Sequence, residues 1–252
     1  MKSMPVGFIT AAALLSSVAI LAQETEQHTH WAYNGKDGPD KWATLDPAYS
    51  ECKLGHHQSP IDIRHTEKAD LPPIQFDYHA SPLNIIDNGH TVMVNYAPGS
   101  FITIGDHRYQ LTQFHFHHPS EEHIHGKGFD MVVHLVHTDA SGNMAVVAVL
   151  LKAGKLNPAL QAMWDHLPRE KDKVVAVEGL SINAADLLPV NRGYYTFVGS
   201  LTTPPCTEPV TWFVLRTPEE ISREEVQLFA NLYPHDTRPT QKLEGRVVRE
   251  SK

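Results

Sequence analysis

Short hydrophobic runs, many of them alternating with polar positions, recur along most of the chain and predict β-strands. The clearest runs lie at 101–104, 109–117, 131–137, 145–151, 174–180 and 210–215. Turn sequences such as Gly105-Asp106 and Ser141-Gly142 separate them. The run AVVAVLL at 145–151 is apolar throughout, which is typical of a central strand covered on both faces. A mostly antiparallel sheet is therefore expected.

Helical patterns are scarce. Asn157-Pro158 precedes a helical run with proline near its first position, and Ser222 followed by Glu225 forms a capping box before VQLFANLY. The expected fold class is α+β, mainly β. We expect a single domain built on a large, twisted, mostly antiparallel central sheet with a few short peripheral helices.

The N-terminal segment has a different pattern. A basic start and an apolar stretch lead to Ala22, after which the chain is polar. This is typical of a secretory signal peptide at 1–22, followed by a domain at 23–252. A short membrane anchor is the alternative, but about 17 apolar residues interrupted by Pro5 are marginal for spanning a bilayer. We expect a periplasmic or secreted protein without stable membrane insertion after cleavage.

The charge and cysteine content of the chain bear on its binding partners and on a possible disulfide. The formal net charge is −8 and the basic residues are scattered, so no cationic surface for phosphates is expected and nucleic acid is not a predicted partner. Cys52 and Cys206 are the only cysteines. In an exported protein they are expected to bridge, closing a loop of about 150 residues. Two buried free thiols are the alternative.

The stretch QFHFHHPSEEHIH at 113–125 concentrates histidines beside two glutamates. In a strand, alternate side chains share a face, so His115 and His117 point to one side and Phe114 and Phe116 to the other. A second strand paired with the first would add His134. Three neutral nitrogen donors with an open fourth position match a catalytic zinc better than a structural one. The other three histidines of the stretch are interpreted as ordinary surface or core residues: His118, His123 and His125.

The segment QFHFHHPSEEHIHGKGFDMVVHLVH at 113–137 resembles the zinc-site signature of the α-carbonic anhydrases of the bacterial, exported type. Further segments resemble the family in family order: HWAYNGKDGPDKW (30–42), HQSPIDI (57–63), NGHTVMVNY (88–96), GSLTTPPCTEPVTW (199–212) and TRPTQKL (237–243). The resemblance implies reversible hydration of CO₂ to bicarbonate and a proton by attack of zinc-bound hydroxide. The implied cofactor is Zn²⁺, and incidental esterase activity could accompany it.

Residue roles follow from the resemblance, position by position. It implies that zinc is held by His115, His117 and His134, and that Gln113 accepts the second N–H of a ligand histidine. Glu121 and Thr202 match the family's gatekeeping pair. In that pair the carboxylate accepts a hydrogen bond from the threonine hydroxyl, and the threonine oxygen then orients the hydroxide. The implied substrate-binding residues are Val136, Val146, Leu201, Thr202, Thr203, Val210 and Trp212. Without the resemblance, the apolar members of this set read as ordinary core.

The resemblance also implies a route for protons. His90 occupies the position of the family's proton shuttle, a role that suits a side chain titrating near neutrality. The connecting waters would be flanked by Tyr33, Asn88 and Met93. A disulfide between Cys52 and Cys206 resembles the one in many bacterial relatives, which are often homodimers.

The chain departs from the family pattern at two related places. Many members carry a carboxylate two residues before the third ligand, where this chain has Val132, and the position after the gatekeeping glutamate is Glu122 instead of His or another polar group. Our hypothesis is that Glu122 supplies the carboxylate that Val132 lacks and orients His134. Met93 and Asp236 also replace more usual amide residues, and Met93 leaves one fewer anchor for ordered water.

Two other functions are compatible with some of the same residues. The spacing of His115, His117 and Glu121 fits half of a cupin metal motif, but the preceding glycine and a convincing second half are missing. A noncatalytic binding module is the third interpretation. Such relatives typically lose a ligand histidine, whereas all three histidines, Glu121 and Thr202 are present here.

Overall fold

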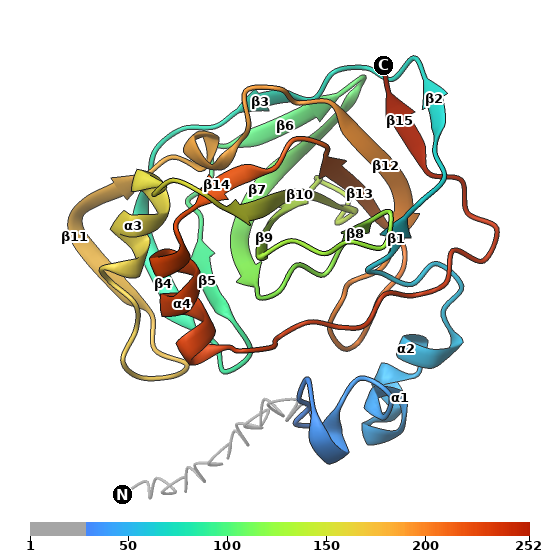
Figure 1. Cartoon of the computed structure of the whole chain (residues 1–252), viewed down its shortest axis with the longest axis horizontal. Coiled ribbons are helices and arrows are strands. Elements are labelled where there is room, and N and C mark those ends of the chain that lie inside the picture. The colour runs from blue at the N-terminus through green and yellow to red at the C-terminus, as the bar shows by residue number, and fades with distance from the viewer. Residues whose placement is uncertain (1–28) are drawn as a thin grey trace, which may run out of the picture.

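The computed structural model describes residues 29–252, drawn in Figure 1. The expected signal peptide at 1–22 lies outside the described residues. The strands are β1 (Asp62–Ile63), β2 (Glu67–Ala69), β3 (Gln75–Asp77), β4 (Ser81–Asp87), β5 (Val92–Asn95), β6 (Phe101–Ile104), β7 (His107–His117), β8 (His123–Ile124), β9 (Met131–Thr138), β10 (Met144–Ala153), β11 (Val175–Ile182), β12 (Tyr194–Gly199), β13 (Val210–Leu215), β14 (Glu219–Ile221) and β15 (Arg249–Ser251). The α-helices are α1 (Trp42–Leu45), α2 (Glu51–Leu54), α3 (Pro158–Trp164) and α4 (Arg223–Leu232). The 3₁₀ turns are η1 (Gly35–Asp37), η2 (Pro47–Tyr49) and η3 (Ala184–Leu187).

A single 13-stranded sheet organises the domain, with the main order β11-β4-β5-β7-β9-β10-β13-β12-β15-β2. Most neighbouring strands are antiparallel, which confirms the expected fold class. The central pair β10–β13 is parallel, a feature that the sequence analysis did not anticipate. A parallel pair needs a long crossover, and here α3, β11 and β12 lie between the two strands in the chain.

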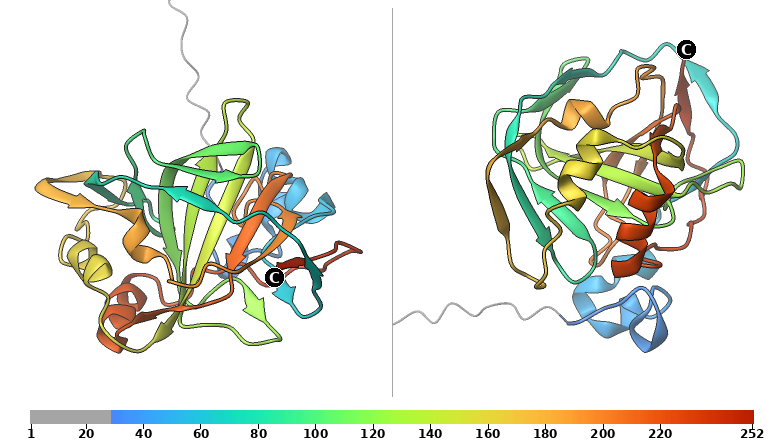
Figure 2. Two further views of the ribbon diagram at one scale, coloured as in Figure 1. Left: turned by 90° about the horizontal axis from the view of Figure 1, so that it is seen from above. Right: turned by 60° about the vertical axis from the view of Figure 1, so that its left-hand side comes forward.

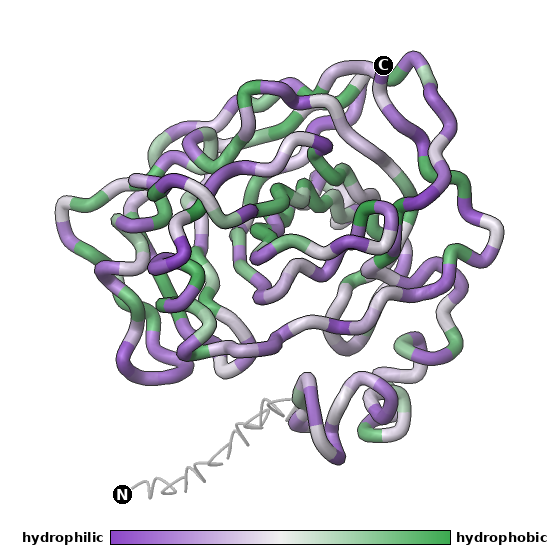
Figure 3. The backbone as a smooth tube through the Cα atoms, viewed as in Figure 1, coloured by the Kyte–Doolittle hydropathy of each residue, from purple (hydrophilic) through white to green (hydrophobic). Residues whose placement is uncertain are grey.

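Strand β10 lies at the centre of the sheet and is covered on both faces, as its apolar sequence predicts. Alternate residues enter two separate hydrophobic clusters, with Val147 and Val149 on one face and Val146 and Ala148 on the other. Figure 3 shows the same concentration of hydrophobic residues in the central strands. Because both faces are buried, neighbouring strands are held in a fixed register.

Helices α3 and α4 cover one face of the sheet (Figure 2). Phe116 of β7 contacts Trp164 of α3, with ring centroids 4.8 Å apart, and Phe229 of α4 at 6.1 Å. Both predicted helix starts are confirmed: the Asn157 side chain caps α3, and Ser222 forms the capping box of α4. The opposite face of β7, which carries the histidines, is therefore directed away from these helices. No helix within residues 29–252 is long and apolar enough to cross a membrane.

Candidate metal centre and active site

Three histidines meet on one face of two paired strands. Strands β7 and β9 are antiparallel, and their register places His115 directly opposite His134. His117 follows on the same face of β7, and the ring centroids of the three histidines are 4.8 to 5.4 Å apart. One ring nitrogen from each histidine lies within 4.8 Å of the others. Among residues 29–252 this is the only such group of three or more histidine, cysteine, aspartate or glutamate side chains.

The outward nitrogens of the two β7 histidines are both hydrogen-bonded. Nδ1 of His115 donates to Oε1 of Gln113 at 2.8 Å, and Nδ1 of His117 donates to the backbone oxygen of Asp236 at 2.7 Å. Because both acceptors are oxygens that cannot donate, each ring carries its hydrogen on Nδ1. Nε2 therefore carries no hydrogen, and its lone electron pair is available to a metal ion. Nε2 of His117 is buried and has no hydrogen-bond partner. An orphaned nitrogen of this kind, in a cluster of imidazoles, fits a divalent cation such as zinc.

The third histidine is held by a carboxylate from another part of the chain. Nε2 of His134 lies 3.0 and 3.1 Å from the two carboxylate oxygens of Glu122, and the Glu122 side chain is fully buried. Val132 instead packs in a hydrophobic cluster with Ile61 and Ile63. The contact on which the Glu122 hypothesis depends is therefore present, and Nδ1 of His134 is left to face the cluster.

Burial controls the charge of the ligand histidines. It lowers the pKa of His115 to about 3 and the pKa of His117 well below its ordinary value, with the neighbouring histidines adding to the effect. Burial would also lower the pKa of His134, but the Glu122 carboxylate outweighs it and the net shift is upward. The neutral form of imidazole is the one that binds metal. His115 and His117 are therefore in the metal-binding form at neutral pH.

Glu121 lies beside this cluster and is also fully enclosed. Its Oε1 atom accepts a hydrogen bond from the backbone N–H of Arg238 at 2.8 Å, and Oε2 lies 3.6 Å from Nε2 of His117. Burial raises the pKa of Glu121 to about 7, while Arg238 and the Thr202 hydroxyl act in the opposite direction. Oε2 has no hydrogen bond of standard geometry, although Thr202 is close enough to affect the pKa.

Arg238 was missed by the sequence analysis. Its guanidinium is buried and donates to Oε1 of Gln58 and to the backbone oxygens of Ser59 and Cys52, at 2.8 to 2.9 Å. It thus joins the segment at 52–59 to the backbone N–H that holds Glu121. The TRPTQKL segment was noticed for its resemblance, but no sequence pattern reveals that its arginine spans these distant groups.

A cavity of about 260 Å³ opens beside the histidines. It is lined by Gln113, His115, His134, Val136, Met144, Val146, Leu201, Thr202, Thr203 and Trp212. Of the expected substrate-binding residues only Val210 is absent from this lining. It is fully buried in the hydrophobic cluster to which Val146 and Trp212 also belong. Met144 was not anticipated. The cavity therefore has an apolar wall and a polar rim next to the metal-ligand candidates.

The expected disulfide is confirmed and lies at the base of the Thr202 loop. Cys52 is bonded to Cys206, and the backbone N–H of Cys206 donates to the oxygen of Thr203 at 2.8 Å. A second backbone bond joins Leu201 to Thr207 at 3.0 Å. The bridge and these two bonds restrain the loop that carries Thr202.

Two of the four expected proton-relay residues, Tyr33 and His90, line a neighbouring pocket of about 320 Å³. The His90 ring stacks on Trp31 with centroids 3.8 Å apart and 7° between the planes. Burial, followed by the nearby His30, lowers the pKa of His90. The edge of the Tyr33 ring faces His117, with centroids 6.4 Å apart. Tyr33 therefore stands between the pocket of His90 and the metal-ligand cluster.

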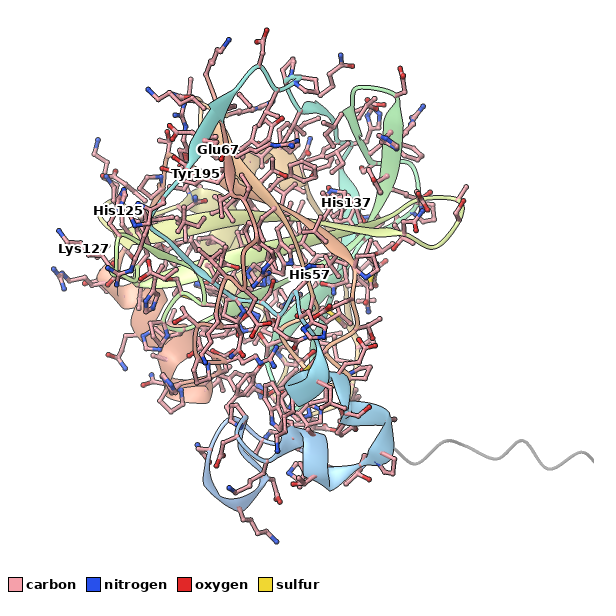
Figure 4. All side chains as sticks on the ribbon, turned by 90° about the vertical axis from the view of Figure 1, so that its right-hand side faces the viewer. His57, Glu67, His125, Lys127, His137 and Tyr195 are labelled. Carbon is pink, nitrogen blue, oxygen red and sulfur yellow. A yellow bond between two sulfur atoms is a disulfide. The ribbon has the colours of Figure 1, made fainter. Side chains whose placement is uncertain are left out.

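The other two residues expected to flank the waters are placed differently. Asn88 uses its side-chain oxygen to accept the backbone N–H groups of His90 and Thr91, at 3.0 and 2.9 Å. Met93 pairs with His115 across β5 and β7. Neither lines the 260 Å³ cavity. The other histidines of the segment 113–125, which are His118, His123 and His125, do not belong to the metal-ligand group. His125 is exposed at the outer edge of the molecule beside Lys127 (Figure 4).

Comparison with known proteins agrees with this geometry. The family model for eukaryotic-type carbonic anhydrase matches residues 37–252. A carbonic anhydrase of Nostoc sp. is 41% identical over 88% of this chain and 86% of its own length, and one of Neisseria gonorrhoeae is 41% identical over 96% of both. The solved structure of α-carbonic anhydrase from Thermovibrio ammonificans, in complex with the inhibitor sulfanilamide, is 40% identical and superposes with a TM-score of 0.85. That match covers 88% of this chain and 99% of the other.

Proposed function

This chain belongs to the eukaryotic-type, or α, carbonic anhydrase family, and from that premise we propose that it hydrates CO₂ reversibly to bicarbonate and a proton with the help of zinc. The observation that carries the proposal is the convergence of His115, His117 and His134 beside an apolar cavity. These three histidines would hold the ion. When bound, Zn²⁺ supplies a nucleophile near neutral pH by lowering the pKa of a water molecule, behaviour for which carbonic anhydrases themselves are the standard example.

The residues around the ligands would keep them in position. Gln113 and the Asp236 carbonyl fix the rings of His115 and His117 by accepting their Nδ1 hydrogens. We propose that Glu122 does the same for His134 and adds a negative charge, which makes the imidazole a stronger donor. Each of these contacts selects the nitrogen that faces the metal.

Glu121 and Thr202 would set the orientation of the nucleophile. An ionised carboxylate can only accept hydrogen bonds, so the Thr202 hydroxyl would donate its hydrogen bond to Glu121. The Thr202 oxygen could then act only as an acceptor toward the nucleophile. The backbone N–H of Arg238 supports the ionised form of Glu121 by donating to it. A nearby cation would favour that form further, against the burial that raises the pKa of Glu121 to about 7.

The cavity suits a small apolar substrate. Val136, Val146, Leu201 and Trp212 present an apolar wall next to the histidines, and Thr203 adds a polar group at the rim. CO₂ needs such a wall, whereas bicarbonate needs hydrogen-bond partners as it forms. Val210 would act indirectly, by supporting the wall from below.

The proton released at the site must leave it, and we propose that His90 carries it to solvent. Tyr33 would flank the water chain, with Asn88 shaping the turn and Met93 beside His115. The Cys52–Cys206 bridge supports an extracytoplasmic location. We propose export guided by a signal peptide, and a homodimer remains a prediction.

Metal analysis combined with stopped-flow CO₂ hydration tests the function. We expect about one zinc per chain, activity that is lost on chelation, and recovery when zinc is returned. Bound iron with oxygen-dependent chemistry would favour the cupin-like alternative. A correctly folded, zinc-loaded protein without hydration activity would leave only the noncatalytic binding module.

A further inference from the structure

We propose that Tyr233 and Asp87 form a clamp that positions the turn carrying His90 and so determines how efficiently this residue exports protons. The inference rests on the proposed relay function of His90. The turn joins β4 to β5, and Asp87 is the last residue of β4. Tyr233 caps the end of α4, from a part of the chain 146 residues away.

Asp87 holds the turn from one side. Its Oδ1 atom accepts a hydrogen bond from the backbone N–H of Gly89 at 2.9 Å, and its backbone oxygen accepts from Asp172 at 2.7 Å. Gly89 has φ of +81°, a conformation that other residues rarely adopt. Asn88 holds the backbone N–H groups of His90 and Thr91 from within the turn, whereas the N–H of Gly89 depends on the Asp87 carboxylate. The position of that carboxylate is in turn set by a contact from outside the turn.

Tyr233 provides that outside contact. Its hydroxyl donates a short hydrogen bond to the same Oδ1 atom of Asp87 that accepts from Gly89. Both side chains are buried, with 9% and 5% of their surface exposed. Burial and the bond to Asp87 raise the pKa of Tyr233, so the phenol remains a donor throughout the neutral range. Tyr233 also lines the pocket in which His90 lies.

The turn is joined to the metal-ligand strand on its other side. The Thr91 hydroxyl donates to the backbone oxygen of Phe116, the residue between His115 and His117, at 2.5 Å. The His90 ring is held against Trp31. The Tyr233–Asp87 bond is therefore the link that fixes the His90 turn to the helical side of the molecule, while Thr91 fixes it to the candidate site.

Removing the Tyr233 hydroxyl should release Gly89 and let His90 shift. A displacement of about 1 Å in a reacting group can cost up to roughly a hundredfold in rate. Because proton export follows the chemical step, the loss should affect kcat in dilute buffer and leave kcat/KM unchanged. A small imidazole buffer should bypass the relay and restore kcat.

The experiment compares three variants of the zinc-loaded protein. Tyr233→Phe removes the clamp, His90→Ala removes the relay, and Tyr194→Phe is the matched control, because the buried Tyr194 hydroxyl donates to the Pro72 carbonyl at 2.6 Å outside both pockets. We expect kcat in dilute buffer to fall about fivefold for Tyr233→Phe and more for His90→Ala. Imidazole should rescue both variants, and Tyr194→Phe should behave like the unmodified protein. Hydrogen exchange at the Gly89 amide should accelerate only in Tyr233→Phe.

The outcomes separate the clamp from the relay. If His90→Ala shows the buffer-dependent loss and Tyr233→Phe does not, the clamp is wrong and the relay stands. If His90→Ala shows no loss, the relay assignment is wrong and the clamp has no function to support. A parallel fall of kcat and kcat/KM in Tyr233→Phe, or unchanged exchange at Gly89, would also overturn the inference.

Discussion

The Glu122 carboxylate contacts Nε2 of His134 through both of its oxygens, at 3.0 and 3.1 Å. The two residues are 12 positions apart and lie on different segments, and both are buried. Position 132, two residues before His134 on the same face of β9, carries valine in a hydrophobic cluster. The carboxylate that the family resemblance predicts at position 132 is thus supplied by position 122, where the family usually has His or another polar residue.

Replacing Glu122 with alanine should weaken zinc binding by roughly 10- to 100-fold, because His134 loses the partner that orients its ring and increases its basicity. Zinc affinity can be measured by competition with a chelator, independently of activity. The double variant Glu122→Ala/Val132→Glu should regain much of the affinity, since a carboxylate is returned to the same face of β9 as His134.

The single variant Val132→Glu is the matched control. It places a second carboxylate beside a buried one, and we expect a loss of stability without a gain in zinc affinity. If the affinity of Glu122→Ala equals that of the unmodified protein, Glu122 does not position His134.

Filling the 260 Å³ cavity should block CO₂ without displacing zinc. Val136 lines this cavity, and Val136→Phe should lower kcat/KM for hydration by at least roughly tenfold while metal content stays at one ion per chain. Val198→Phe is a suitable control because Val198 is 45% exposed on β12 and lies outside the cavity. An unimpaired Val136→Phe enzyme would place the substrate elsewhere.

The parts of the site that the sequence could predict are those that depend on strand periodicity. Alternation alone places His115 and His117 on one face, and the apolar run in β10 predicts its central position. The sequence could not reveal the exact partner of His134 across the sheet, because register depends on the packing of both faces. Nine of the strands were also missed: β1 to β5, β8, β12, β14 and β15.

Contacts made by backbone groups and by distant segments were the least predictable. The acceptor for His117 is the Asp236 carbonyl, which any residue at that position could provide. Arg238 and Tyr233 act on groups more than 100 positions away. No local pattern marks such residues, since their role exists only after the sheet has brought the segments together.

Loss of the disulfide should destabilise the protein more than it changes the chemistry. The bridge spans 154 positions, and removing such a constraint costs up to about 5 kcal/mol on the chain-entropy model. We expect Cys52→Ser/Cys206→Ser to unfold at lower urea concentration. Its kcat/KM should change less than its stability, because the backbone bonds from Cys206 to Thr203 and from Leu201 to Thr207 still hold the Thr202 loop in the folded protein.

Thiol titration of the unmodified protein after denaturation is the accompanying control and should detect no free thiol. An unchanged urea midpoint in the double variant would show that the bridge contributes nothing to stability.

His137 should make the protein less stable in acid. It is fully buried, its Nε2 atom lies 2.7 Å from the Tyr78 hydroxyl, and burial lowers its pKa to about 3. In the unfolded chain the pKa of histidine is about 6.5. Between these values the unfolded state binds a proton that the folded state does not, so the free energy of unfolding falls as pH decreases, by at most about 1.4 kcal/mol per pH unit from this group. The contribution is complete above about pH 6.5 and is lost progressively toward pH 3.

Urea unfolding of the unmodified protein and of His137→Gln between pH 4 and pH 8 checks this. The other buried histidines titrate in both proteins, so they cancel in the difference. The stability advantage of the unmodified protein should be constant above about pH 6.5 and should shrink below it. His125→Gln is the control, because His125 is exposed and its removal should leave the pH dependence unchanged. A difference between the unmodified protein and His137→Gln that stays constant down to pH 4 would mean that His137 is protonated in the folded state, and its neutral contact with Tyr78 would then be wrong.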